Sequence, residues 1–228
     1  FGTIIEELQG QLNRYQAAAF EGISIDRDFK IGHAVTEIVD FAQTNRVDLI
    51  VMPTHGRTRF RELLLGSVTS GVLHDTESPV LTAAHVEVPS DEAEHIRTIL
   101  VAVEIDHRTP KLIAVGNSMA KAFGAGLHIV HASPDDGAGV AQYMDPAWRN
   151  EVARIMKEKI EVAVKDAAAD AKIHVIPGEA AKVVRAVAED VHADLVILGR
   201  HIDKSILGRL RTHSYAIVRE SPCPVLSV

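Results

Sequence analysis

The residues best suited to binding chemistry lie in one polar loop between residues 52 and 68. Gly56 and Gly66 are separated by nine residues, and Ser67 follows directly, ahead of an amphipathic segment. Glycine lets a backbone amide approach a phosphate closely, while a serine hydroxyl at a helix start donates to a phosphate oxygen beside the positive end of the helix dipole. The loop also carries three arginines: Arg57, Arg59 and Arg61. Arginines on such a loop are more often solvated than bound, so the glycines and the serine carry the prediction of a phosphate site.

Other reactive residue types form no recognisable site. Cys223 is the only cysteine and lies in Ser-Pro-Cys-Pro with no activating neighbour, so we interpret it as a small buried hydrophobe. The twelve histidines are scattered without the spacing of metal ligands. Neither a Gly-x-x-x-x-Gly-Lys loop nor a nucleophile elbow occurs. We therefore predict no metal site, no catalytic residue and a protein that is not an enzyme.

Composition limits the classes of binding partner and the cellular compartment that we expect for this chain. The net charge is −7, and acidic and basic residues alternate, so no basic face is offered to a nucleic acid. No run approaches the about 20 apolar residues that span a bilayer, and no leader resembles a signal peptide. A single cysteine fits a reducing compartment. We expect a cytoplasmic protein that binds neither nucleic acid nor membrane.

The chain contains an internal repeat. Gly32 and Gly178 each precede a helical stretch and then an apolar run, and Asp48 and Asp194 open those runs at the same offset of 146 positions. Farther on, Ser-Pro-Val-Leu and Cys-Pro-Val-Leu recur at an offset of 145. The two copies therefore share one order of elements, and the second has lost one residue from its loop.

Periodicity predicts the elements that position these loops. In the second copy, short apolar runs predict five strands, and helical spacing predicts four helices between them. The strands are Ile99–Val103, Leu127–Ala132, Ile173–Ile176, Ala193–Leu198 and Pro224–Val228, and the helices are Lys111–Phe123, Pro146–Ala169, Ala180–Val191 and Ser214–Arg219. Alternating strands and helices are typical of an α/β fold with a doubly wound, five-stranded parallel sheet. Two tandem copies of this fold are predicted.

The first copy is predicted by working backwards from its end. The expected strands are Ile23–Asp28, Asp48–Met52 and Val80–Ala83, and the expected helices are Thr3–Ala18, His33–Thr44 and Leu63–Leu73. A counterpart of Ile99 would lie before residue 1, so we expect the chain to begin within a domain that lacks its first two strands and first helix. The predicted domains are residues 1–86 and 96–228, joined by a linker at 87–95.

The segment from Met52 to Val68 closely resembles the signature loop of universal stress proteins, whose nucleotide-binding members carry Gly-x-x-Gly, nine residues, then Gly-Ser or Gly-Thr. The resemblance covers nearly the whole chain and implies a tandem universal stress protein of the adenine nucleotide alpha hydrolase-like fold. Pro53 replaces the first glycine and removes one amide donor. By resemblance, ATP or AMP would be bound in the first copy by Thr54, His55, Gly56, Arg57, Gly66, Ser67, Val68 and Thr69.

The second copy departs further from the family pattern. Ile202 replaces the second glycine, and Glu104 stands where the family's nucleotide-holding aspartate is expected. The predicted degenerate second site consists of Glu104, Gly199, Arg200, Arg211 and Thr212. Two interpretations stay open: a solvated loop in a degenerate copy, or a pocket for another anion or for a nucleotide held by side chains.

Three functions follow from the resemblance. The leading hypothesis is a stress-response protein that binds adenine nucleotide in its first copy. The alternatives are a dimerising interaction module that needs no nucleotide, and a slow ATPase. Family members commonly pair through the strand that ends each copy, here Val80–Ala83 and Val225–Val228, so a homo-oligomer or pairing within the chain is expected.

Overall fold

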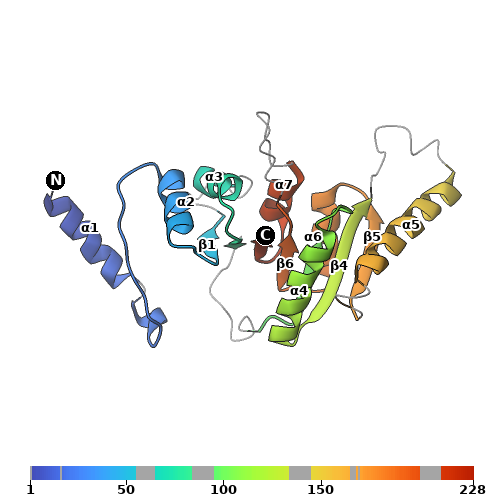
Figure 1. The fold of residues 1–228 in the computed structure, drawn as a ribbon, viewed down its shortest axis with the longest axis horizontal. Coiled ribbons are helices and arrows are strands. Elements are labelled where there is room, and N and C mark those ends of the chain that lie inside the picture. The colour runs from blue at the N-terminus through green and yellow to red at the C-terminus, as the bar shows by residue number, and fades with distance from the viewer. Residues whose placement is uncertain are drawn as a thin grey trace.

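The computed structural model describes residues 2–15, 17–54, 65–83, 95–133, 145–164, 168, 170–200 and 212–228 (Figure 1). Its strands are β1 (Ile50–Pro53), β2 (Val80–Ala83), β3 (Thr98–Ala102), β4 (Gly126–Ser133), β5 (Lys172–Pro177), β6 (Leu195–Leu198) and β7 (Val225–Ser227). Its helices are α1 (Gly2–Arg14), α2 (Ala34–Thr44), α3 (Ser67–Asp75), α4 (Thr109–Phe123), α5 (Pro146–Val164), α6 (Ala180–Asp190) and α7 (Thr212–Glu220), and a 3-10 turn spans Ala17–Phe20. All seven strands form one sheet in the order β1-β2-β7-β6-β3-β4-β5.

The second copy has the predicted doubly wound architecture. Its strands β7-β6-β3-β4-β5 are mutually parallel. Alternate residues of β3 enter different cores, Ile99 and Val101 on the side of α4 and α5, and Leu100 on the side of α6 and α7. A strand covered on both faces must be apolar at every position, which is why β6 reads Leu-Val-Ile-Leu and is buried throughout. The α/β fold class and its five strands are confirmed.

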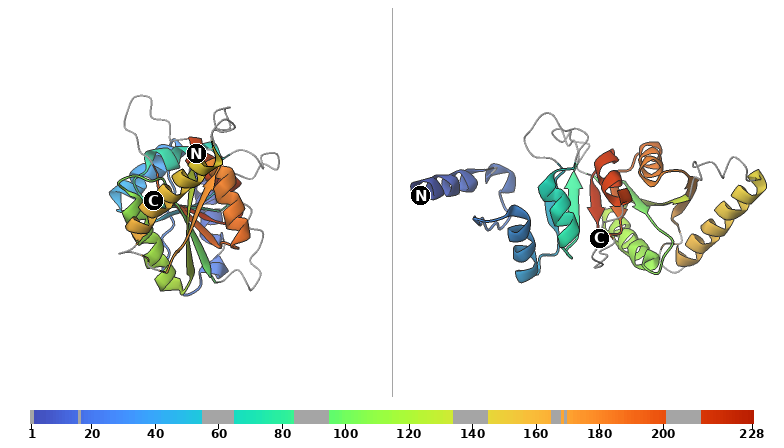
Figure 2. Two further views of the ribbon diagram at one scale, coloured as in Figure 1. Left: turned by 90° about the vertical axis from the view of Figure 1, so that its right-hand side faces the viewer. Right: turned by 90° about the horizontal axis from the view of Figure 1, so that it is seen from above.

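Within its described residues, the first copy contributes β1 and β2 to the sheet. The predicted strand Ile23–Asp28 is wrong, because those residues belong to no strand. A strand exists only by hydrogen bonding to a neighbour, and no described strand lies beside them. α1 lies apart from the sheet, at the N-terminal end of the molecule (Figures 1 and 2). The last helix of this copy begins at Ser67, four residues after its predicted start, and residues 63 and 64 lie outside the described part.

The two copies join through their last strands. β2 and β7 pair antiparallel, with Leu81 opposite Leu226 and with Val80 and Thr82 opposite Ser227 and Val225. Leu81 and Leu226 are repeat equivalents, so a local twofold axis passes between them. The predicted pairing of the copies within one chain is therefore confirmed, whereas pairing between chains stays a prediction.

One core runs across this join. Val72, Leu73 and Val80 of the first copy belong to the same buried cluster as Val218 and Val225 of the second. Burial of branched side chains from both copies in one cluster stabilises their relative placement. The helix that follows the first-copy loop, α3, is therefore packed against the second copy.

Candidate functional site

The two ends of the first-copy loop meet at the carboxyl end of β1. Thr54 follows β1 directly, and its carbonyl accepts a hydrogen bond of 2.8 Å from the Gly66 amide, one residue before α3. Residues 55–64 between them lie outside the described residues, and with them the predicted site residues His55, Gly56 and Arg57. The structure therefore places the beginning and the end of the loop beside each other.

The start of α3 presents backbone donors. Gly66 is its N-cap residue, with φ −59° and ψ 143°, and no side chain of the described residues caps it. The Gly66 carbonyl accepts the first helical bond, from the Ser70 amide at 2.8 Å. The amides of Ser67, Val68 and Thr69 come before any helical acceptor, and they carry the positive end of the helix dipole. Ser67 is exposed, so its hydroxyl can reach an anion at this position.

The two predicted threonines lie beneath the surface. Thr54 is 1% exposed, and its hydroxyl donates to the Ala83 carbonyl at 3.3 Å. Thr69 is 4% exposed, and its hydroxyl donates to the Pro53 carbonyl at 2.9 Å. The Thr69 bond fastens α3 to the end of β1, and the Thr54 bond joins the residue after β1 to the end of β2. The exposed residue at the helix start is thus Ser67, with the half-buried Val68 beside it, while the Gly66 amide and both threonine hydroxyls already bind backbone carbonyls.

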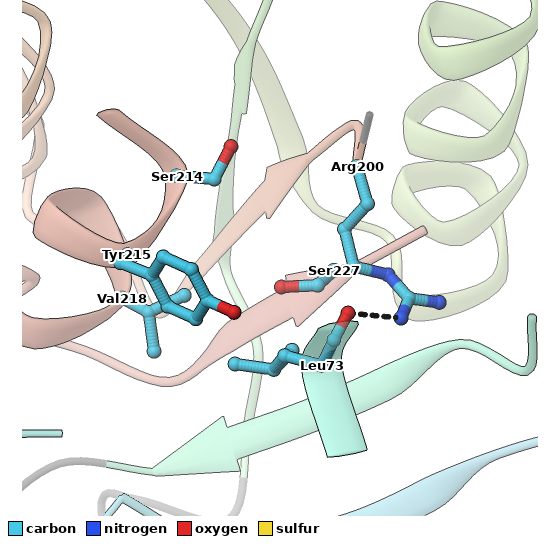
Figure 3. A pocket seen from close by; sticks show the side chains of 6 residues that line it. All are labelled: Leu73, Arg200, Ser214, Tyr215, Val218 and Ser227. Carbon is cyan, nitrogen blue, oxygen red and sulfur yellow. Dashed lines mark hydrogen bonds between the residues drawn. The ribbon is translucent and has the colours of Figure 1, made fainter. Parts of the chain in front are cut away.

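In the second copy, the residue that follows β6 and Gly199 reaches across to the first copy. The side chain of Arg200 is buried and crosses to the first copy, where its Nη1 donates to the carbonyls of Leu73 and Thr76, both at 3.0 Å (Figure 3). Its Nη2 donates to the Ser78 carbonyl at 2.6 Å. Burial lowers the pKa of Arg200 from its ordinary value, although a guanidinium stays protonated in proteins. The guanidinium of Arg200 is thus held by carbonyls of the first copy.

Side-chain hydrogen bonds of Arg108 and Thr109 hold the segment that follows β3. Both Nε and Nη2 of Arg108 donate to Asp106, at 3.0 and 2.6 Å, and Nη1 donates to the Arg200 carbonyl at 3.4 Å. Burial alone would raise the pKa of Asp106, but hydrogen bonds and charge from Arg108 outweigh burial and lower that pKa. The Thr109 hydroxyl donates to the carbonyl of the exposed Glu104. Sequence reasoning missed this cluster, and its signal was the Asp-x-Arg-Thr run that begins three residues after the end of the predicted strand Ile99–Val103.

The structure says less about the remaining predicted residues of the second site. Arg211 lies outside the described residues, and Thr212 begins α7 without a described side chain. Gly199 is exposed, and a Cβ added there would meet only Leu112 Cδ2, at an ordinary 3.5 Å. For this second-copy set, the described contacts are therefore those of Arg200 with the first copy and that of the Glu104 carbonyl with Thr109.

Comparison with known proteins identifies the family. A model of the universal stress protein family matches residues 3–83 and 95–228, nearly the whole chain. The chain belongs to the universal stress protein family. Two matched segments agree with two universal stress protein domains in tandem. The solved universal stress protein of Archaeoglobus fulgidus superposes with a TM-score of 0.69 at 25% identity, covering all of this chain and 79% of that one.

Sequence relatives match shorter stretches. A universal stress protein of Synechocystis is 41% identical over 61 residues, which is 27% of this chain and 21% of that protein. A universal stress protein of Methanocaldococcus jannaschii is 40% identical over 77 residues, 33% of this chain and 45% of that protein. This universal stress protein thus spans less than half the length of these two relatives.

The described part of this universal stress protein contains neither a membrane-spanning helix nor a cluster of metal ligands. No described helix is both long enough and apolar enough to cross a membrane. Likewise, no three histidine, cysteine or acidic side chains among the described residues are grouped as metal ligands would be.

Proposed function

We propose that this universal stress protein binds an adenine nucleotide, ATP or AMP, in its first copy, and that it acts in a stress response by binding rather than by turnover. One observation carries the proposal: the Gly66–Ser67 start of α3 is held against the end of β1 by the bond from Gly66 to Thr54. Helix-start amides beside a serine hydroxyl suit a phosphate group. The position, at the carboxyl ends of parallel strands, is where ligands bind in open α/β sheets.

The proposal assigns one nucleotide to each chain. In the second copy, the residue equivalent to Thr54 is Arg200, whose guanidinium is engaged by three carbonyls of the first copy. A guanidinium held in this way is unavailable to a phosphate in its own loop. A stoichiometry of one nucleotide per chain is therefore expected.

A matched pair of variants tests the site. Ser67 begins α3 and its repeat equivalent Thr212 begins α7, so Ser67→Ala and Thr212→Ala make the same kind of change in the two copies. Loss of a hydrogen bond to a charged phosphate should weaken ATP binding by about tenfold in Ser67→Ala. Thr212→Ala should bind like the unmodified chain. Isothermal titration with ATP and AMP gives both affinity and stoichiometry.

The titration also separates the alternatives. A chain that binds neither nucleotide, and shows no thermal shift with either, would contradict the proposal and favour the interaction module. Phosphate release above background that Ser67→Ala abolishes would favour the slow ATPase.

A further inference from the structure

The helix α3 receives side-chain hydrogen bonds from the second copy at two levels. Near its C-terminal end, Arg200 donates to the carbonyls of Leu73, Thr76 and Ser78. In its middle, the Tyr215 hydroxyl donates to the Ser70 carbonyl at 3.0 Å. The same helix begins at the proposed phosphate site. One nine-residue helix therefore connects that site to the second copy.

The chemistry of the Arg200 contact suits the end of a helix. The last carbonyls of a helix lack intrahelical donors and carry the negative end of its dipole, so a cation is favourable there. The planar guanidinium can reach several carbonyls at once, whereas a lysine ammonium is a single point charge. Arg200 is 7% exposed, and its Nε has no partner among the described residues. The guanidinium is therefore held in place by the bonds from Nη1 and Nη2 to the three carbonyls.

The two copies differ in the residue at the position of Arg200. Arg200 and Thr54 are repeat equivalents, and their amides make the same bond, to the carbonyls of Val228 and Ala83 respectively. The side chain of Thr54, however, is short and donates to Ala83 within its own copy. Tyr215 is in turn the equivalent of Ser70, so these two meet across the local twofold axis. The second copy thus holds the helix of the first by a long cationic side chain, and the equivalent residue in the first copy is a short threonine.

We propose that Arg200 and Tyr215 are positioning residues for the first-copy site, so that the degenerate second copy braces the helix that binds phosphate. This inference rests on the proposed function. A binding site works only when its donors are held to within about half an ångström by the residues behind them. Contacts at the middle and the end of so short a helix set the direction in which its first amides point.

Two conservative variants of the full chain test the brace. Arg200→Lys keeps the charge but loses the planar fork, and Tyr215→Phe removes only the hydroxyl. Both should raise the Kd for ATP by about three- to tenfold, through loss of roughly one net hydrogen bond each. Both should also speed hydrogen exchange of the α3 amides from Ser70 to Asp75, while the amides of α4 keep their protection. Arg185→Met is the control, because Arg185 is an exposed arginine of the second copy that pairs with Glu189.

The two readouts separate the outcomes. Unchanged exchange of α3 in both variants would overturn the brace. Faster exchange of α3 with an unchanged Kd would overturn the positioning role. Failure of the unmodified chain to bind ATP would instead overturn the proposed function, and hydrogen exchange, which needs no nucleotide, would still decide whether Arg200 and Tyr215 hold α3.

Discussion

Two histidines of the second copy face each other across neighbouring strands. His128 Nδ1 on β4 lies 3.0 Å from His174 Nε2 on β5, with ring centroids 5.2 Å apart and ring planes inclined by 11°. A bond of this kind needs one donor nitrogen and one acceptor nitrogen, so it breaks when both rings are protonated. Burial lowers the pKa of both histidines. The charge of His174 and of Lys172 lowers the pKa of His128 further, and Asp190 acts in the opposite direction on both.

We predict that this pair makes the protein sensitive to mild acid. Above the unfolded pKa of about 6.5, both histidines are neutral in the folded and in the unfolded chain, so their titration does not reduce the free energy of unfolding. Below that pH the unfolded chain takes up protons that the folded pair resists, so the free energy of unfolding falls until the lowered folded pKa values are reached. The urea concentration at the unfolding midpoint should therefore decrease as the pH is lowered from about 8 to about 5.5.

A double variant identifies the source of that slope. His128→Leu with His174→Leu should unfold with a flatter pH dependence, whereas His33→Gln, a change at an exposed histidine, should keep the original slope. An equal slope in the double variant would assign the acid sensitivity to other groups.

At the residue scale, the sequence predicted which positions matter better than it predicted what they do. The repeated aspartate was recognised, and the structure gives its purpose in the second copy: Asp194 Oδ2 accepts the amides of Arg97 and Thr98 at 2.7 and 2.9 Å, at the start of β3. Arg200 was grouped with its own loop because it lies next to it in sequence. Its direction depends on a partner 122 to 127 positions earlier, which local sequence cannot specify.

At the element scale, the two copies pack their last two helices with different side chains. A Cβ added to Gly71 on α3 would lie 2.6 Å from Val35 Cγ2 on α2, too close for two carbons. The repeat equivalents of Val35 and Gly71 are Ala181 and Ala216. A valine facing a glycine in the first copy thus corresponds to two alanines in the second.

This exchange predicts strong coupling between the two positions. Gly71→Ala alone should destabilise the chain by about 1–3 kcal/mol through overpacking, even though alanine is the better helix former. In a Val35→Ala background the same change should be neutral or stabilising, because the pair then matches the second copy. Urea unfolding of the two single variants and the double variant measures the coupling. Additive effects would show that α2 and α3 separate easily at this point.

The ends of helices and strands that pack against neighbours on both sides were predicted to within a few residues. The wrong predictions have a physical cause. A continuous apolar run such as Leu195–Leu198 identifies a strand without knowledge of the neighbouring strands. A strand that is covered on both faces needs apolar residues at every position. Residues 23–28 carry a weaker alternation, and pairing decides whether such a segment becomes a strand. No described strand pairs with them, and the prediction fails there.

At the scale of the whole molecule, topology followed from general rules, but the join between the copies did not. Parallel strands with right-handed crossovers leave few arrangements for five strands and four helices. The resemblance to universal stress proteins implied that Val80–Ala83 and Val225–Val228 would pair, yet it left open whether they pair within or between chains. In the structure they pair within one chain, and the resulting sheet is continuous (Figure 2).

This join predicts the outcome of a crosslinking experiment. Leu81 and Leu226 lie directly opposite each other in antiparallel strands, where Cα atoms are about 4.5–5.5 Å apart and within disulfide range. Leu81→Cys with Leu226→Cys should therefore oxidise to a crosslinked monomer, visible by mass and by faster migration on a non-reducing gel, even in dilute solution. Burial raises the pKa of Cys223 to about 11, so the native thiol should not compete, and each single variant serves as a control. A disulfide-linked dimer as the main product would instead place the join between chains, and the bonds from Arg200 to α3 would then connect two molecules rather than two halves of one.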